Sequence, residues 1–325
     1  MGMNNNAIGY LENIRKKQGN KNCREVFNKI LKDSKDKAVA LINEEHITFP
    51  CLFLLFHDIK AATLYPNLNN QNRNVYDMIQ RTLSPNRSNF SNNDDSEHKI
   101  LKWILETGSD EYELNEQYEY ILDITVSVLI NTYLDKSILP IVVEMIFERN
   151  RTGRYTHDLV WSAFRANHPL TLKMIAERLK SANKEDVELA CRLLNIEVIN
   201  RENNPSFYQT LYNKYTEWLE ENSPFLYFTG ENMQYSSMPV FYLVDYERKY
   251  IFKDLSTYTK TSVKPSDDER NCLEAFKTLS QEDQMMLADY SYKVHNRDIG
   301  EWKNWIYQPI SEQIKAAKEN RGDWA

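Results

Sequence analysis

The sequence predicts an all-α protein, and three observations lead to that prediction. Only 8 of the 325 residues are glycine, whereas about 7% is usual. Apolar residues recur at intervals of three and four along most of the chain, which is the period of an amphipathic helix. The stretches between these segments are short and polar. A doubly wound sheet or a large β-sandwich would need more turns that contain glycine.

The spacing of the glycines also excludes two kinds of nucleotide site. No two glycines lie closer than the seven positions that separate Gly2 from Gly9. A dinucleotide fingerprint needs glycines two and three positions apart, and a P-loop needs them five apart. Any phosphate chemistry would therefore rest on a metal ion or on arginine.

Composition limits the class of protein further. The net charge of −7 lacks the overall basic footprint of a nucleic-acid-binding protein. The longest apolar runs, Phe49–Phe56 and Ile138–Phe147, are shorter than the ~20 residues of a membrane span, and Met1–Tyr10 has no apolar signal-peptide core. The four scattered cysteines form no CxxC pair, which is typical of free thiols in a reducing compartment. Because such a compartment is typical of the cytoplasm, we expect a cytoplasmic protein. The many asparagine, lysine, isoleucine and tyrosine residues suggest an AT-rich genome, and we expect a bacterial source.

The first half of the chain is predicted to be a series of helices separated by asparagine-rich loops. The expected helices are Ile8–Lys17, Cys23–Leu31, Lys37–Asn43, Phe49–Ala62, Val75–Leu83, Asp95–Glu106, Glu116–Leu134 and Ile138–Arg149. Because Phe49–Ala62 is apolar nearly all round, we expect it to be buried. Asn67–Asn74 is expected to be a loop, and Asn86–Asp95 has the composition of a disordered one.

The most regular stretch consists of three helices of similar length, Asp158–Ala166, Leu170–Leu179 and Asp186–Leu194. Their apolar residues are Leu159, Val160, Ala163 and Phe164, then Leu172, Ile175, Ala176 and Leu179, then Val187, Ala190, Leu193 and Leu194. This pattern resembles HEAT or armadillo-type helical repeats over Ser137–Asn195, and more loosely over Cys23–Leu134. The resemblance implies an irregular α-solenoid of helix pairs whose concave face binds something large.

An aromatic-rich insertion interrupts the helical pattern. A long helix, Ser206–Glu221, is followed by ten aromatic residues within Phe225–Tyr258. Residues 240–252 fit either a small β-hairpin of Val240–Val244 with Lys249–Phe252 or a helix. Helices then resume over Asp268–Leu279, Gln281–Lys293 and Ile299–Asn320, the last broken at Pro309. We therefore expect a helical-repeat array (1–200), a long helix with the insertion (201–265) and a C-terminal helical cap (266–325).

One dipeptide suggests metal chemistry. His57-Asp58 resembles the HD dipeptide of metal-dependent HD-domain phosphohydrolases, which are all-helical. That resemblance implies a divalent metal held with a second histidine upstream, here His46, and an aspartate downstream, here Asp123. Lys60 stands where a glycine usually follows the motif, however, and the gap between the two histidines is short. The alternative interpretation is a histidine at the end of a buried helix.

Two further groups are candidates for partner binding. The first is the densest positive cluster and the arginines of the regular repeats: Arg149, Arg151, Arg154, Arg165 and Arg178. If they lined one groove they would form an anion site; otherwise they are solvated charges. The second is the aromatic segment, with Tyr235 and Tyr242, since tyrosine is favoured at protein interfaces. The alternative role of that segment is to fill a core.

These observations favour a non-enzymatic scaffold that binds a protein partner and needs no cofactor. The first alternative is the HD-type phosphohydrolase, which requires His46, His57, Asp58 and Asp123 to come within metal-bonding reach of one another. The second alternative is a nucleic-acid-binding repeat protein that uses the arginine surface. The scaffold hypothesis expects an exposed apolar or aromatic patch, which a uniformly charged surface would contradict.

Overall fold

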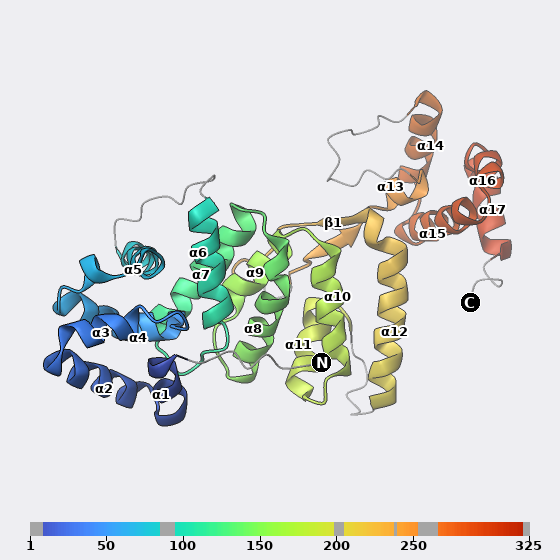
Figure 1. The fold of residues 1–325 in the computed structure, drawn as a ribbon. Helices are drawn as coiled ribbons and strands as arrows, with labels where there is room; N and C mark the ends of the chain where they lie inside the picture. Colours follow the sequence, from blue (N-terminus) through green and yellow to red (C-terminus); the bar gives the residue numbers. More distant parts are fainter. Residues whose placement is uncertain (1–8, 85–94, 198–204, 237–238, 253–265, 321–325) are drawn as a thin grey trace. The chain divides into compact units, whose positions relative to one another are not determined.

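The prediction of an all-α protein is confirmed in the computed structural model (Figure 1). It describes residues 9–84, 95–197, 205–236, 239–252 and 266–320. In this part of the chain, helices account for nearly all regular structure, and the sole sheet has two short strands. The chain divides into two compact units, residues 1–166 and residues 167–325. This division differs from the three segments expected from sequence, and we describe each unit by itself.

Unit 1 contains the helices α1 to α9. They are α1 (Tyr10–Gln18), α2 (Asn20–Asp33), α3 (Lys35–Ile42), α4 (Phe49–Ala61), α5 (Asn70–Leu83), α6 (Asp95–Gly108), α7 (Glu116–Asn131), α8 (Leu139–Arg151) and α9 (His157–Arg165), with short 3-10 turns at Tyr65–Asn67 and Lys136–Ile138. Helices that follow each other in the chain pack together, α1 on α2, α6 on α7 and α8 on α9. Helix α4 also contacts α6, which brings the start of the unit against its middle.

Helix α4 is buried, as its sequence predicts. Its Phe49 ring stacks on Tyr118 of α7, with ring centroids 5.0 Å apart. Gly108, at the end of α6, allows this close packing, because a Cβ there would lie 2.7 Å from the Tyr118 hydroxyl and 2.8 Å from a Phe49 ring carbon. The Tyr118 hydroxyl donates to the Gly108 carbonyl at 2.8 Å. These contacts fix the end of α6 beside the beginning of α4.

The asparagines have a structural use at the helix starts. The side chains of Asn69, Asn115 and Asn183 accept hydrogen bonds from backbone N–H groups in the first turns of α5, α7 and α11 (Lys184–Leu193). Such N-caps satisfy donors that have no partner within the helix, and each stabilises it by about 1 kcal/mol. Short polar joints therefore suffice to end one helix and begin the next.

Unit 2 contains the remaining helices and the sheet. Its elements are α10 (Pro169–Glu177), α11 (Lys184–Leu193), α12 (Pro205–Asn222), β1 (Leu226–Phe228), β2 (Tyr242–Val244), α13 (Tyr246–Tyr250), α14 (Asp267–Lys277), α15 (Gln281–Arg297), α16 (Ile299–Ile306) and α17 (Ile310–Glu319), with 3-10 turns at Arg178–Lys180 and Ser223–Phe225. The predicted break at Pro309 is confirmed, since α16 ends before it and α17 begins after it.

The observed sheet differs from the β-hairpin that is one of the two predictions for residues 240–252. Strand β2 lies within the expected strand Val240–Val244, but its partner is β1, in the antiparallel register Leu226↔Val244 and Phe228↔Tyr242. Of the segment expected to be the second strand, Lys249 and Tyr250 belong to α13, and Ile251 and Phe252 form a turn. Asp245 accepts a hydrogen bond from the Arg248 backbone N–H at 3.0 Å and so caps α13 directly after β2.

The C-terminal helices enclose an aromatic core. Tyr250 stacks on Phe276 with centroids 4.2 Å apart, and Trp302, Trp305 and Ile306 form the buried stripe of α16. Lys249 is wholly buried beside this core. Its ammonium group donates to Asn222 of α12 at 2.8 Å and to Asp289 of α15 at 2.5 Å, which joins α12, α13 and α15.

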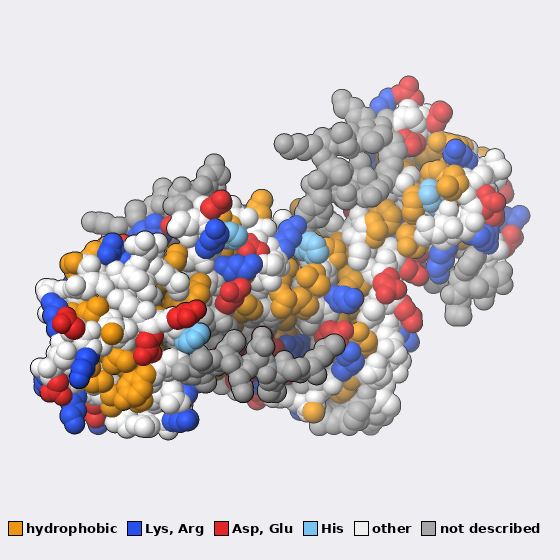
Figure 2. Space-filling view, viewed as in Figure 1, with side chains coloured by type: hydrophobic (Ala, Val, Ile, Leu, Met, Phe, Trp, Pro, Cys, Tyr) orange, Lys and Arg blue, Asp and Glu red, His pale blue; other side chains and the backbone are white. Residues whose placement is uncertain are grey.

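Three further sequence predictions concern a disordered loop, membrane-spanning helices and the character of the surface. Residues 86–94 of the loop expected to be disordered lie outside the described residues. Over the described ranges, no helix combines the length and the apolar character that a membrane crossing requires. The visible face of each unit carries acidic and basic side chains interspersed with apolar ones (Figure 2).

Candidate functional site

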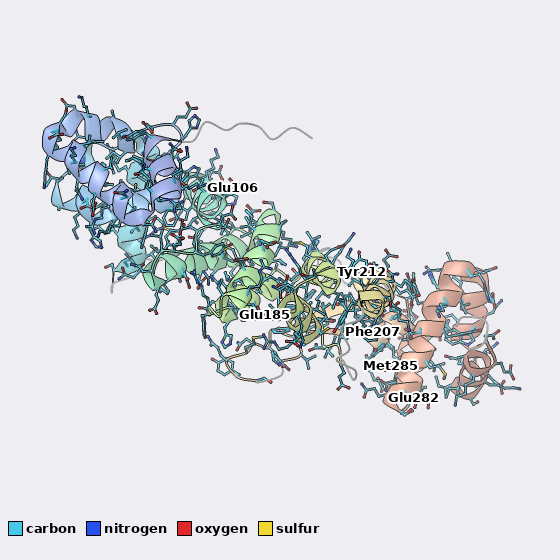
Figure 3. All side chains as sticks on the ribbon, turned by 90° about the horizontal axis from the view of Figure 1, so that it is seen from below. Glu106, Glu185, Phe207, Tyr212, Glu282 and Met285 are labelled. Carbon is cyan, nitrogen blue, oxygen red and sulfur yellow. The ribbon has the colours of Figure 1, made fainter. Side chains whose placement is uncertain are left out.

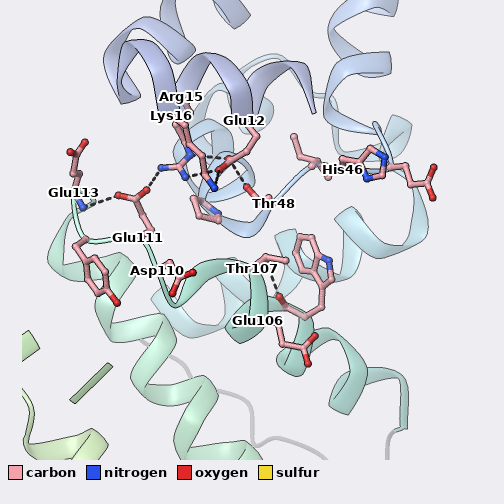
Figure 4. Close-up of a pocket in the computed structure, with 15 residues that line it drawn as sticks. Glu12, Arg15, Lys16, His46, Thr48, Glu106, Thr107, Asp110, Glu111 and Glu113 are labelled. Carbon is pink, nitrogen blue, oxygen red and sulfur yellow. Dashed lines mark hydrogen bonds and ion pairs between the residues drawn. The ribbon is translucent and has the colours of Figure 1, made fainter. Parts of the chain in front are cut away.

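The candidate site is a pocket of about 720 Å³ within unit 1. Its walls come from α1, from the loop between α3 and α4, and from the end of α6 with the loop that follows it. The lining residues are Glu12, Arg15, Lys16, Glu45, His46, Ile47, Thr48, Pro50, Trp103, Glu106, Thr107, Asp110, Glu111, Tyr112 and Glu113. Figure 4 shows α1 with Glu12, Arg15 and Lys16 on one side, and Glu106, Thr107 and Asp110 on the other.

A buried ion-pair network forms one wall of the pocket. Glu12 and Arg15 lie one turn apart on α1, and the guanidinium donates to both Glu12 carboxylate oxygens at 2.9 and 2.7 Å. Arg15 also donates to Glu111 in the loop after α6. The side chains of Glu12 and Arg15 are 3% and 6% exposed. Solvent and salt therefore weaken the attraction between these charges little. The network ties the start of the unit to the α6–α7 loop.

The surroundings of Glu12 keep its carboxylate ionised. Burial alone would raise its pKa, but hydrogen bonds from Arg15, Thr48 and Cys51 outweigh burial and lower the pKa to about 2. The Thr48 hydroxyl donates at 2.6 Å and the Cys51 thiol at 3.2 Å. For Arg15, burial favours the neutral form, yet the bonds to the two glutamates raise the pKa above its ordinary value. Both groups are therefore charged over the physiological range of pH.

The rest of the lining is strongly acidic. Six carboxylates line the pocket, against the cations Arg15 and Lys16. Lys16 lies 3.6 Å from Glu12, so both cations already have acidic neighbours. Among the carboxylates of the pocket lining, four are exposed to solvent and have no ion-pair partner within the described part of the chain: Glu45, Glu106, Asp110 and Glu113. Glu106 is marked on α6 in Figure 3. The pocket therefore has an excess of negative charge that faces solvent.

Aromatic and apolar side chains complete the lining. Trp103 and Tyr112 are half-buried, and Ile47 and Pro50 are buried. The guanidinium of Arg154 lies 5.7 Å from the centre of the Tyr112 ring, so this ring already packs with one cation. Burial, together with the nearby Asp110, raises the pKa of Tyr112 to about 12. Carboxylates beside aromatic faces form an environment that suits an organic cation.

The four residues of the HD hypothesis are not assembled into one site. His46 is exposed and lines the pocket, and His57 is exposed near the end of α4. Asp58 accepts hydrogen bonds from Arg24 at 2.6 Å and from Asn28 at 3.1 Å. Across the described ranges, no three histidine, cysteine or acidic side chains are grouped so that they could hold a metal ion.

Asp123 has a structural partner instead. It lies 2.7 Å from the guanidinium of Arg149, whose side chain is 3% exposed. Arg149 also donates to the Tyr155 carbonyl at 3.2 Å, which fixes the loop after α8. Burial raises the pKa of Asp123 to about 7, against the opposing effect of Arg149. This pair holds α7 against α8.

The candidate arginines do not line one free basic groove. Arg149 is buried, Arg151 pairs with Glu144 and Glu148, and Arg154 pairs with Glu119 at 2.6 Å. Arg165 is exposed, with its guanidinium 5.5 Å from the centre of the Trp161 ring. Arg178 belongs to unit 2 and is half-buried. In unit 1 the predicted positive cluster is therefore largely neutralised by carboxylates.

The two candidate tyrosines differ in exposure. Tyr235 is 88% exposed, whereas Tyr242 is 6% exposed. The Tyr242 hydroxyl donates to the Leu194 carbonyl at 2.6 Å and accepts from the Tyr215 hydroxyl at 3.0 Å. Tyr242 also lines an apolar groove of about 660 Å³ in unit 2.

Of the residues that line the pocket, only His46 is a candidate on sequence grounds. The spacing of Glu12 and Arg15 is a visible signal, since residues three apart on a helix are neighbours. The link from Arg15 to Glu111 spans 96 residues, so no local pattern could have revealed it. Compared with known proteins, the chain matches no family model, no curated protein and no solved structure.

Proposed function

We propose that this protein is a non-enzymatic interaction scaffold whose pocket in unit 1 binds a basic segment of a partner protein. The observation that carries the proposal is the charge of the pocket. Four exposed carboxylates there have no ion-pair partner among the described residues, and both lining cations already lie beside glutamates. A lysine or arginine side chain entering the pocket would find carboxylates at its rim and aromatic rings beside them.

The buried network supports a binding role more than a catalytic one. Glu12 has a pKa of about 2, far below the value that suits proton transfer near neutral pH. Its oxygens are occupied by Arg15, Thr48 and Cys51. We therefore assign Glu12, Arg15 and Glu111 to positioning the pocket wall. The solenoid arrangement suggested by the repeat resemblance, and a cytoplasmic, bacterial setting, are parts of the same proposal.

The proposal is tested with a charged peptide and a matched pair of variants. The probe is a fluorescein-labelled peptide of alternating lysine and alanine, titrated with the full chain and followed by fluorescence anisotropy. Its lysine-acetylated form tests whether the charge is required. We expect the triple variant Glu106→Gln, Asp110→Asn, Glu113→Gln to bind about tenfold more weakly, because pocket carboxylates act at short range.

The control variant removes the same charge elsewhere in unit 1. Glu25→Gln, Asp33→Asn and Asp36→Asn change exposed residues of α2 and α3 that do not line the pocket. We expect this control to bind less than about twofold more weakly, because its charges lie farther from the peptide. Equal losses in the two variants would mean that net charge alone attracts the peptide. Equal binding of the acetylated peptide would also contradict the proposal.

A further inference from the structure

The small sheet of unit 2 has an unpaired edge on β2. The Thr229 N–H donates to the Phe241 carbonyl at 3.1 Å, and the Asp245 N–H donates to the Phe225 carbonyl at 2.9 Å. With the register Tyr227↔Leu243, the odd-numbered residues of this strand direct their backbone groups toward β1. The N–H and C=O groups of Tyr242 and Val244 therefore point away from β1. No other described residue is hydrogen-bonded to them.

An apolar groove runs beside that edge. It has a volume of about 660 Å³, and every residue from Pro239 to Val244 lines it. Tyr215 and Trp218 of α12 and the end of α11 with the residues after it complete the lining. No residue of β1 lines the groove. Because β1 does not contribute, the groove lies on the β2 side of the sheet. The unpaired backbone groups and the apolar lining therefore belong to one surface.

Buried hydroxyl groups hold the strand in position. The bond from Tyr242 to the Leu194 carbonyl and the bond from Tyr215 to Tyr242 anchor β2 to α11 and α12. Burial raises the pKa of Tyr242 to about 12 and raises the pKa of Tyr215 above its ordinary value, so both hydroxyl groups stay protonated. An edge that is fixed before binding loses little conformational entropy when a ligand pairs with it.

The charge of the groove restricts what it can hold. Its two ionised lining residues are Arg192 and Glu197, of opposite sign, and neither has an ion-pair partner among the described residues. The groove is thus close to neutral and suits a segment of little net charge. A strongly basic segment, which fits the acidic pocket of unit 1, has no comparable complement here.

We propose that the β2 edge binds an extended segment of a partner protein, with apolar side chains at alternate positions and little net charge, as a third strand. The segment would accept from and donate to the backbone of Tyr242 and Val244, and its apolar side chains would enter the groove beside Trp218. Addition of a strand at a sheet edge gives affinity through main-chain bonds and specificity through alternate side chains. All the residues of this proposed site belong to unit 2, so its binding can be tested independently of binding at the acidic pocket of unit 1.

The probe for this proposal is a peptide obtained by selection on the protein itself. A displayed library of random linear peptides is selected on the full chain, and the strongest binder is synthesised with single N-methyl groups along its backbone. We expect selected peptides with apolar residues at alternate positions and low net charge. N-methylation at alternate residues should weaken binding about tenfold, because it removes donors that pair with β2, and methylation between them should change it little.

Two variants of the protein complete the test. Val244→Pro removes an N–H that makes no bond to β1, since proline is tolerated at a sheet edge, and should weaken binding about tenfold. The control is Tyr227→Phe, which changes an exposed residue of β1 outside the groove lining and should bind as the parent does. Circular dichroism checks the fold of both, and the N-methylated peptides decide the matter if Val244→Pro does not fold.

Three results would overturn the inference. One is a library that yields no peptide whose binding depends on Val244. Another is weakening that has no alternation along the N-methyl series. The third is a dimer in analytical ultracentrifugation that Val244→Pro dissociates, because the edge would then be occupied by a second copy of this chain.

Discussion

The acidic pocket of unit 1 and the apolar groove of unit 2 are of similar size but differ in how they could recognise a ligand. The pocket, about 720 Å³, has six carboxylates, whereas the groove, about 660 Å³, has one. The pocket offers charge and aromatic faces; the groove offers backbone hydrogen bonds and apolar contact. Their volumes alone therefore do not show that the two sites would bind different ligands. Their chemistry predicts two ligands that share little, a basic segment and a nearly neutral strand.

The two sites also differ in what supports them. An ion-pair network buried in unit 1 supports the pocket wall, whereas a pair of neutral tyrosine hydroxyls supports the groove. Buried charges are costly to leave unpaired, and buried neutral hydroxyls cost less. Substitutions in the two supports should therefore differ in magnitude and in their response to pH and salt.

The largest expected effect is the loss of Arg15. In Arg15→Met, Glu12 and Glu111 lose their shared cation, and we expect the free energy of unfolding to fall by about 3 to 5 kcal/mol. Urea denaturation followed by circular dichroism measures it. Lys16→Met is the control, because Lys16 is 60% exposed and should change stability by at most about 0.5 kcal/mol. A similar loss in both variants would mean that the buried network does not stabilise the pocket.

The next effect is a pH dependence carried by Glu12. Its pKa is lowered from 4.5 to about 2 by folding. The stability that it contributes is therefore full above about pH 4.5 and is lost as the pH falls toward 2. We expect the difference in unfolding free energy between the parent and Glu12→Gln to shrink by about 3 kcal/mol over that range. A difference independent of pH would contradict the lowered pKa.

Removal of the tyrosine hydroxyl in unit 2 should cost less. Tyr242→Phe leaves the Leu194 carbonyl and the Tyr215 hydroxyl without their partner, and we expect a loss of about 1 to 2 kcal/mol that does not vary between pH 4 and 8. Thermal and urea unfolding measure it. Tyr227→Phe, at a site that is 56% exposed, is the control and should be nearly neutral. If Tyr242→Phe lost as much unfolding free energy as Arg15→Met, the expected difference between the buried ion pairs of unit 1 and the buried hydroxyls of unit 2 would be contradicted.

Salt should affect binding at the two sites differently. We expect an increase from about 50 to about 500 mM sodium chloride to weaken lysine-peptide binding about tenfold, because salt screens exposed charges. Binding of the neutral peptide at β2 should change by less than about twofold. Anisotropy titrations of both peptides provide the comparison. Equal salt sensitivity would mean that both peptides bind through charge.

The sequence predicted the fold better than it predicted the site. Helical periodicity is local, so it located most helices and the break at Pro309. The partner of β2 was not predictable in the same way, because two strands of three residues pair across an intervening loop. Asp245 caps the short helix that follows β2, and an aspartate at such a position is a helix-start signal that the sequence itself carries.

The candidate residues show why site prediction was harder. The adjacent residues His57 and Asp58 suggest a metal site, yet Asp58 accepts hydrogen bonds from Arg24 and Asn28 of another helix. Arg149 stands in a basic run but is buried against Asp123. Glu12, Arg15 and Glu111 meet across nearly one hundred residues, and only the packing of α4 between α1 and α6 brings them together. Pairings of this kind depend on tertiary structure.

The most direct measurement is hydrogen exchange of the full chain followed by mass spectrometry, with each peptide in turn. We expect the lysine peptide to slow exchange in residues 45–48 and 106–113 and to leave 242–244 unchanged. We expect the neutral peptide to slow exchange in 242–244 and to leave the pocket segments unchanged. If both peptides protected the same segments, or if the lysine peptide protected no part of the pocket, the assignment of two chemically distinct sites would be contradicted.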